Sequence, residues 1–308
     1  MKQAYIDRRF SPGSLAIIER ADSICAEYAD QGFDLTLRQL YYQFVARGFL
    51  PNRQSEYKRL GSIVNDARLA GLLDWSAIVD RTRDLETLPT WNSPAHIIRD
   101  DAQVFLFDAW EDQPTRVEVW IEKDALTGVI EPVCRRNQVP YLSCRGYTSQ
   151  SEVWGASQRI GGYLDGAAEG VVILHLGDHD PSGLDMTRDI EDRLKLFLEG
   201  DGHDPAALTI DRIALNMDQV QRLNPPPNPA KMTDSRSAGY VKRFGRTSWE
   251  LDALDPRTLD ALIQGEIEGN RDPDLWSVQV SRRDDARRLL ALAGRRWNDV
   301  VAYLESAA

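Results

Sequence analysis

Cysteine is scarce in this chain of 308 residues, which contains only Cys25, Cys134 and Cys144. An odd number of widely separated cysteines does not suit a disulfide framework, so we expect reduced thiols in a cytoplasmic protein. The four histidines show no zinc-ligand spacing with these cysteines. These features argue against a small disulfide-rich secreted domain and against a structural zinc site.

Long apolar runs are also missing. No stretch approaches the roughly 18 apolar residues that span a bilayer, and the first ten residues, MKQAYIDRRF, lack the apolar core of a signal peptide. We therefore expect no membrane partner. The composition, 42% hydrophobic and 28% charged, is typical of a globular protein, and 308 residues suffice for about two domains.

Positive charge is in deficit. The net charge of −11 argues against a general nucleic-acid coat. Residues 1–100 hold 13 basic and 13 acidic side chains, so the acidic excess lies downstream. One downstream segment, 222–246, is an exception with six basic residues and one acidic residue. A flexible basic loop of this kind suits a phosphate backbone, although a solvated surface loop would have the same composition.

The first third of the chain has three helical patterns. Ser11 and Pro12 begin a helix that ends near Asp30, and Thr36 with Gln39 forms a capping box for a second helix. Ser55 caps a third helix that Gly71 closes, and two short β-like pieces follow at 72–80 and 81–83. This order is typical of a winged helix, which binds DNA, although many such units bind proteins instead.

Two adjacent tyrosines in the second helix have different predicted environments. Leu37, Leu40, Tyr41, Phe44 and Val45 form its apolar face. Tyr42 lies about 140° around the helix from Leu37, one turn beyond Arg38. We therefore expect Tyr41 in the core and Tyr42 exposed or facing a cleft, with a surface tyrosine stacked on its neighbour as the alternative.

The pattern changes to alternating strands and helices after a linker region at 87–111. The predicted strands are Val117–Ile121, Val139–Ser143, Val171–Leu176 and Leu208–Ala214. The predicted helices occupy 126–133, a segment starting at Ser149 or Ser151, and 184–198, with further helices at 256–267 and 283–305. This order predicts an α/β fold, a Rossmann-like parallel sheet with helices on both faces. We expect two domains, at 1–95 and 96–308.

Carboxylates follow two of the predicted strands. Asp178 and Asp180 come just after the buried strand 171–176, and Glu122 follows strand 117–121. The carboxyl ends of such strands are where ligands bind, and three converging carboxylates are suited to hold Mg²⁺ against a phosphodiester. An isolated Asp-x-Asp is more often a helix cap or a solvated loop.

A glutamate after one strand and Asp-x-Asp after a later one resemble the Toprim domain, shared by topoisomerases, bacterial primases and some nucleases. The segments here are VEVWIEKDAL and VVILHLGDHDPSG. The form Asp-x-Asp-Pro-x-Gly resembles the A subunit of DNA topoisomerase VI and its meiotic double-strand-break relatives. In length and build the chain is similar to stand-alone "mini-A" proteins of mobile elements, which lack a fused ATPase.

A second motif supports this resemblance. That family has the motif Arg-x-x-aromatic-Tyr on a helix of its winged-helix domain, where the aromatic position is often tyrosine. The last tyrosine of the motif is the nucleophile. Here the segment is Arg38-Gln39-Leu40-Tyr41-Tyr42, with Gln39 replacing a frequent acidic residue. Arg145-Gly146-Tyr147 is similar to the family's basic-glycine-aromatic turn. The resemblance covers about residues 30–215 and does not assign the rest.

The resemblance implies a Mg²⁺-dependent double-strand break by attack of Tyr42, which leaves a 5′-phosphotyrosyl link. Arg38 would stabilise the phenolate or phosphate, and Glu122, Asp178 and Asp180 would hold the metal. The implied assembly is a homodimer in which tyrosine and metal come from different protomers. No glycine-rich nucleotide loop is present, so strand passage would require a separate ATPase partner.

Two other functions remain open: a Toprim nuclease that uses Mg²⁺-activated water, and a DNA-binding partner without catalysis. Candidate contacts to double-stranded DNA are the basic residues of the third helix, the wing, the glycine turn and the basic segment. They are Lys58, Arg59, Arg68, Arg81, Arg83, Arg145, Lys242, Arg243 and Arg246.

Five further residues have two interpretations each. His175 and His179 either contact the metal-binding acids and orient them, or are buried histidines with satisfied hydrogen bonds. Glu250 and Asp252 form a second metal site or cap a helix, and Lys123 contacts phosphate or pairs with a carboxylate.

Overall fold

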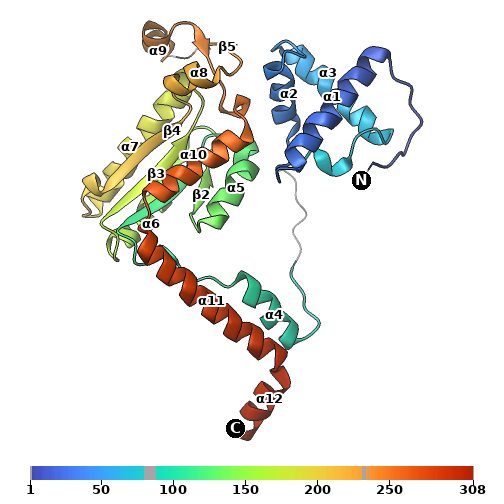
Figure 1. Cartoon of the computed structure of the whole chain (residues 1–308). Coiled ribbons are helices and arrows are strands. Elements are labelled where there is room, and N and C mark those ends of the chain that lie inside the picture. The colour runs from blue at the N-terminus through green and yellow to red at the C-terminus, as the bar shows by residue number, and fades with distance from the viewer. Residues whose placement is uncertain (1, 80–87, 231–233, 235, 308) are drawn as a thin grey trace.

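The structure, a computed structural model, describes residues 2–79, 88–230, 234 and 236–307. Figure 1 shows a group of helices at the N-terminal end, an α/β part built on a sheet, and a helical arm, formed by residues 94–104 and 273–307, that carries the C-terminus. None of the helices in these ranges has the length and hydropathy to cross a membrane.

The N-terminal helices are α1 (Pro12–Ala29), α2 (Leu37–Ala46) and α3 (Gln54–Leu69), close to the predicted ranges. Two predicted caps are confirmed, since the Ser11 hydroxyl accepts the Ser14 N–H and Thr36 forms the capping box with Gln39. The predicted Ser55 cap is wrong, because Ser55 lies inside α3 and the N-cap is Arg53. The buried faces of these helices form one core, which also takes in Ala253 from the other end of the chain. The N-terminal helices are therefore packed onto the α/β part.

The predicted first half of the wing is not a strand. Asp74 accepts the Ser76 N–H at 2.9 Å and starts a 3₁₀ turn, Trp75–Ala77, where the sequence suggested β-structure. The extended residue that follows, Ile78, forms one isolated parallel bridge with Leu35. Arg81 and Arg83 lie outside the described residues.

A four-stranded parallel sheet is the centre of the α/β part, as the sequence predicted. Its strands lie in the order β2 (Tyr141–Ser143), β1 (Thr115–Ile121), β3 (Gly170–Leu176) and β4 (Leu208–Ala214). Apolar side chains dominate β3 because both of its faces are covered.

Helices cover the two faces of the sheet (Figure 1). On one face α5 (Thr127–Arg136) and α10 (Pro256–Gly269) share a core with Val119, Leu174 and Ile213. On the other face α6 (Gln150–Leu164) and α7 (Pro181–Gly200) pack on Trp120 and Ile173. Of the two serines proposed to begin α6, Ser149 is the N-cap.

The basic segment 222–246 is not simply a loop, contrary to the prediction. It begins in α8 (Met217–Leu223), pairs β5 (Asn228–Pro229) with β6 (Thr247–Ser248), and contains α9 (Ser237–Phe244). Tyr240 is buried and its hydroxyl lies 2.8 Å from His179 Nδ1, so this side chain anchors α9 to the turn after β3. Lys231 lies outside the described residues.

The region predicted as a linker contains a helix, α4 (Pro94–Val104), which packs along α11 (Pro273–Arg295). Ser93 caps α4, and Pro94 occupies its first turn, where no N–H donor is required. The predicted single helix at 283–305 is also wrong, because α11 ends at Arg295 and α12 (Trp297–Ala307) follows. The expected domain boundary at 95/96 falls within α4.

Gly183 should be essential for the turn after β3. A Cβ at this position would collide with the Asp178 carbonyl and lie 3.1 Å from Glu122 Oε2. We predict that Gly183→Ala lowers the free energy of unfolding by about 1–3 kcal/mol, measured by urea denaturation. Gly200→Ala on the same helix meets nothing within 4 Å and should be neutral or stabilising. Equal stabilities of the two variants would contradict this account of the turn.

Candidate active site

A cavity of about 300 Å³ lies between α2 and the carboxyl edge of the sheet. Its walls include Arg38 and Tyr42 from α2, Asp178 and Asp180 from the turn after β3, and Glu250. Residues far apart in the sequence thus face one space. A single chain brings the candidate tyrosine and two of the candidate metal ligands together.

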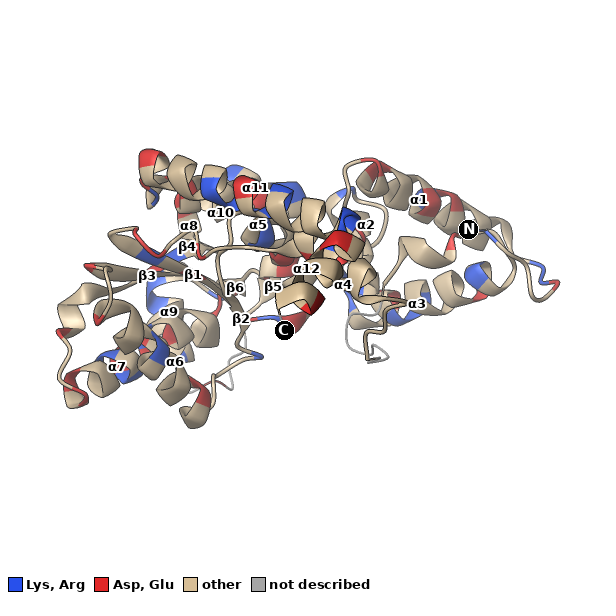
Figure 2. Ribbon diagram, turned by 90° about the horizontal axis from the view of Figure 1, so that it is seen from below, with Lys and Arg blue, Asp and Glu red and all other residues tan. Residues whose placement is uncertain are grey.

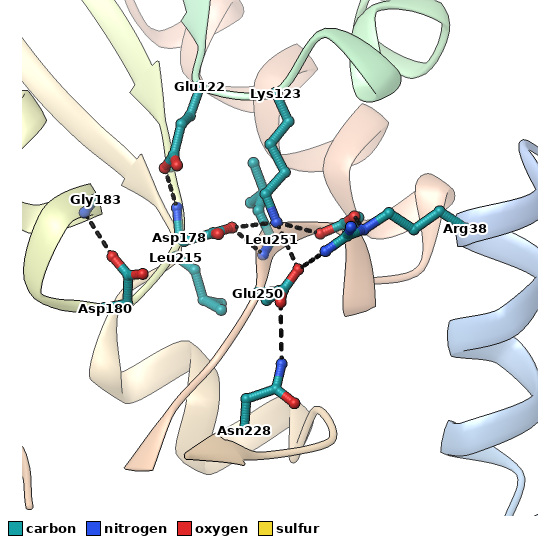
Figure 3. Close-up of polar contacts among 12 residues, drawn as sticks. Arg38, Glu122, Lys123, Asp178, Asp180, Gly183, Leu215, Asn228, Glu250 and Leu251 are labelled. Atoms are coloured by element: carbon teal, nitrogen blue, oxygen red, sulfur yellow. Dashed lines mark hydrogen bonds and ion pairs between the residues drawn. The ribbon is translucent and has the colours of Figure 1, made fainter. Parts of the chain in front are cut away.

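Each of the three predicted acids uses one oxygen to hold the turn. Glu122 Oε2 accepts the Asp178 N–H at 2.8 Å, and Asp178 Oδ1 accepts the Leu251 N–H at 2.8 Å. Asp180 Oδ1 accepts the Gly183 N–H at 2.6 Å, so Asp180 is also the N-cap of α7. The second oxygen of each carboxylate accepts no hydrogen bond from the residues that the structure describes (Figure 3).

Arg212 holds the same turn through hydrogen bonds to its backbone. The sequence motifs did not include this residue. This buried side chain of β4 donates to the carbonyls of Gly177 at 2.9 Å and Asp178 at 2.6 Å, and to Thr187 Oγ1 at 2.8 Å. Burial lowers its pKa to about 10 despite the nearby carboxylates. The one sequence signal for a role of Arg212 is that it is the only cation in the predicted strand LTIDRIA. Its hydrogen-bond partners are distant in sequence, so this signal does not identify them.

A charged cluster connects the turn to α2. Lys123 Nζ lies 2.9 Å from Asp178 Oδ1, 2.9 Å from Glu250 Oε2 and 2.5 Å from Asp252 Oδ1. Arg38 pairs with the same Glu250 and Asp252 (Figure 3). The structure thus pairs these two acids with cations, and Glu250 makes no capping hydrogen bond to the 3₁₀ turn Leu251–Ala253 that follows it. A second metal site at these acids stays a prediction. Of the two roles considered for Lys123, pairing with carboxylates is the one observed.

Tyr42 faces the cavity, which agrees with the prediction of a cleft-facing side chain. It is not exposed, however, because only 4% of the residue is accessible to solvent. The Arg38 guanidinium lies 5.7 Å from the centre of its ring. Burial and the acids Glu250 and Asp252 raise the pKa of the phenol, whereas Arg38 and a hydrogen bond to Asn228 act in the opposite direction. Tyr41 is buried as predicted, and its hydroxyl accepts the Arg53 N–H at 2.7 Å.

Two of the acids, Asp178 and Glu122, resist ionisation. Burial, reinforced by Glu122 and Asp252, raises the pKa of Asp178 to about 7 although Lys123 opposes the shift. Burial also raises the pKa of Glu122, and Asp180 adds to that effect. Carboxylates that repel one another in a partly dry site favour a bound cation.

The side chains of the two histidines beside the acids have hydrogen-bond partners that do not line the cavity. His175 Nδ1 lies 2.9 Å from Thr187 Oγ1, and burial with the nearby Arg212 lowers the His175 pKa to about 3. His179 Nδ1 lies 2.8 Å from the Tyr240 hydroxyl, and its ring contacts Phe244 and Trp249. The prediction of buried histidines fits both, although His175 Nε2 has no partner among the described residues.

The predicted DNA contacts divide into two groups. Lys58, Arg59, Lys242, Arg243 and Arg246 are exposed. Arg68, in contrast, donates to the carbonyls of Trp75 and Ile78 and lies over the Trp75 ring, so it holds the 3₁₀ turn.

The predicted glycine turn has the backbone that its sequence suggests. Arg145 and Gly146 have φ values of 53° and 88°, and Arg145 pairs with Asp124 at 3.2 Å. Tyr147 donates its hydroxyl to Asp185 at 2.7 Å, so the aromatic residue anchors the turn to α7.

The donor set fits Mg²⁺ in chemistry, since it offers carboxylate oxygens that no other described residue uses. Among the residues that the structure describes, however, no three His, Cys, Asp or Glu side chains are grouped closely enough to hold a metal. Binding would therefore require the acids to turn toward a common point. The magnesium site stays a prediction.

Glu250 gives the charged cluster a pH dependence. Burial opposes its ionisation, but Lys123 and Arg38 outweigh burial and lower its pKa to about 2, from an ordinary 4.5. Its ionised form thus stabilises the fold above about pH 4.5, and this contribution is lost as the pH falls toward 2.

We predict that Glu250→Gln costs about 1–2 kcal/mol at pH 7, with allowance for solvent screening, and that the difference from wild type shrinks toward pH 2. Denaturation curves across this range measure it. Glu199→Gln, an exposed acid on α7, is the control and should match wild type throughout. A Glu250→Gln deficit independent of pH would contradict the assignment.

Comparison with known proteins adds no identification. No family model matches the chain, and no curated protein matches it in sequence. What the chain does is therefore inferred from the cavity and its residues.

Proposed function

We propose that this chain is a Mg²⁺-dependent DNA-cleaving protein of the topoisomerase VI A-like type, with Tyr42 as its nucleophile. One observation carries the proposal: Tyr42, Arg38, Asp178 and Asp180 line a single cavity of about 300 Å³. A nucleophile, a cation for phosphate and metal-binding oxygens are the groups that phosphodiester transesterification requires.

In the proposed reaction the Tyr42 oxygen bonds to phosphorus while the bond from phosphorus to the 3′ oxygen breaks. The phenol proton ends on the 3′ hydroxyl, so atoms and charge balance. A free tyrosine with a pKa near 10 is a poor nucleophile at neutral pH. Arg38 and Asn228 are the groups that favour the phenolate here, since both act against the effect of burial on the Tyr42 pKa.

Arg38 also has a role toward substrate. It is engaged by Glu250, which lines the cavity, and by buried Asp252. A phosphate that enters the cavity carries the same sign of charge as Glu250 and offers the same two-oxygen geometry to a guanidinium. Phosphate would thus replace Glu250 as the partner of Arg38 while Asp252 keeps the arginine in place.

Asp178, Asp180 and Glu122 would hold the Mg²⁺ through the oxygens that accept no hydrogen bond from described residues. Bound Mg²⁺ supplies neutralisation of charge on the phosphate oxygens. Arg212 and Gly183 position the acids by fixing the turn that carries them.

The proposal extends to assembly and partners. A homodimer would carry two such cavities, one for each strand of duplex DNA. The exposed Lys58 and Arg59 on α3 are available to a phosphate backbone, as in a winged helix. Strand passage would depend on a separate ATPase.

Hydrolysis is the second candidate, and the burial of Tyr42 favours it. With 4% of the residue exposed and its phenol pKa raised by burial, a water molecule would be the easier nucleophile. The two reactions differ in their products, because only transesterification leaves DNA joined to protein after denaturation.

The decisive comparison uses supercoiled plasmid and Mg²⁺. Tyr42→Phe should abolish protein-linked DNA ends, whereas Tyr57→Phe should retain them. Tyr57 lines the same cavity, but its hydroxyl makes no hydrogen bond with described residues, which makes it a matched control. Ends linked to protein in Tyr42→Phe would contradict the role of Tyr42, and cleavage without any linkage in wild type would establish hydrolysis.

Metal binding is measurable without cleavage. Mg²⁺ at a hundred times its Kd should stabilise the wild type by about 2.7 kcal/mol, measured by thermal unfolding, and EDTA should reverse the shift. Asp178→Asn and Asp180→Asn should remove it. Asp192→Asn, an exposed acid on α7, should keep it. A shift that survives in both site variants would place the metal elsewhere.

A further inference from the structure

We infer that the helical arm carries a second binding site, a groove between α4 and α11 that takes the phosphate backbone of duplex DNA. The inference rests on the proposed function, because it concerns the same substrate at a distance from the cavity. The groove has a volume of about 720 Å³ and is lined by Arg99, Arg287, Arg288 and Arg295, with the small Ala102 and Ala291 between them. Among the described residues, no carboxylate lines it.

The arrangement of the arginines follows from the two helices. Arg287, Ala291 and Arg295 are four residues apart and share one face of α11, and Arg99 enters from α4. Gly294 allows this close approach, since a Cβ there would lie 2.6 Å from Arg99 Cγ. Small residues between the guanidinium groups keep the groove open.

The positive charge of the groove is largely uncompensated. Arg99 and Arg287 donate through Nε to the carbonyls of Ala95 and Phe105, which carry no charge. Arg295 forms no ion pair with any residue that the structure describes. Arg288 pairs with Asp285 at 3.0 Å, but both side chains are at least 70% exposed, so the pair is weak. The chain as a whole has a net charge of −11, so this groove differs in sign from the average of the molecule.

The shape of the groove favours an extended polyanion over a single phosphate. From Arg287 to Arg295 the helix rises about 12 Å, whereas one DNA strand carries a phosphate about every 3.4 Å along its axis. The row of guanidinium groups therefore matches three or four successive phosphates. Arginine forms two parallel hydrogen bonds with a phosphate and reads no base sequence. Figure 2 marks the basic positions of α11 in blue and its acidic positions in red.

The test is DNA binding by the full chain in EDTA, where cleavage does not interfere. A fluorescent duplex is titrated at several salt concentrations, and the slope of log K against log[salt] is compared between two variants. Arg288→Gln with Arg295→Gln removes two groove charges. Arg283→Gln with Arg296→Gln removes two charges from the same arm that pair with Asp284 and Asp299 and do not line the groove.

The groove variant should reduce the magnitude of the slope by about 1.8, two lost phosphate contacts at about 0.9 each. The control pair should leave it near the wild-type value, and equal melting temperatures would show that both variants fold. Equal slopes in the two variants would overturn the inference, as would a groove variant that loses binding to polyglutamate but not to DNA. Protein-linked ends, scored separately with Tyr42→Phe, report on the cleavage proposal whichever way this result falls.

Discussion

The charged cluster of Arg38, Lys123, Asp178, Glu250 and Asp252 is the interaction on which the site depends. It joins α2 to the carboxyl edge of the sheet, and it is where the N-terminal helices acquire a fixed place beside the acids of the turn. Asp252 is nearly inaccessible, and a buried acid of this kind is stable only with its cations in place. Loss of either cation would thus separate Tyr42 from the acids as well as weaken the fold.

The acids of the turn combine a structural role with an oxygen that is available to a ligand. Each acid of the turn holds backbone with one oxygen and keeps the other available, while Lys123 partly satisfies the charge of Asp178. Arg212 and Gly183 have structural roles, because they hold the turn. Asp178, Asp180 and Tyr42, in contrast, face the cavity. Burial, reinforced by repulsion from Glu122 and Asp252, raises the pKa of Asp178, and a bound cation would favour its ionised form.

Features of the fold that depend on neighbouring residues, such as buried strands and helix caps, could be predicted from the sequence. The apolar run 171–176 gave a buried parallel strand, and Thr36 with Gln39 gave a capped helix that turns Tyr42 toward the cavity. The failures have long-range causes. Ser93-Pro94 begins α4, but this helix is stabilised by α11, about 180 residues away, and from the local sequence alone Pro94 indicates a linker. Arg212 and the pairing of Glu250 with Lys123 and Arg38 depend on tertiary neighbours that no spacing in the sequence reveals.

The central claim is that the Tyr42 oxygen reaches a phosphodiester held beside Asp178 and Asp180. Mass spectrometry of the protein after incubation with Mg²⁺ and DNA, followed by nuclease and trypsin digestion, tests it most directly. The account predicts a nucleotide adduct on the peptide Gln39–Arg47, attached at Tyr42. Cleaved DNA with an adduct on another residue, or with no adduct at all, would contradict it.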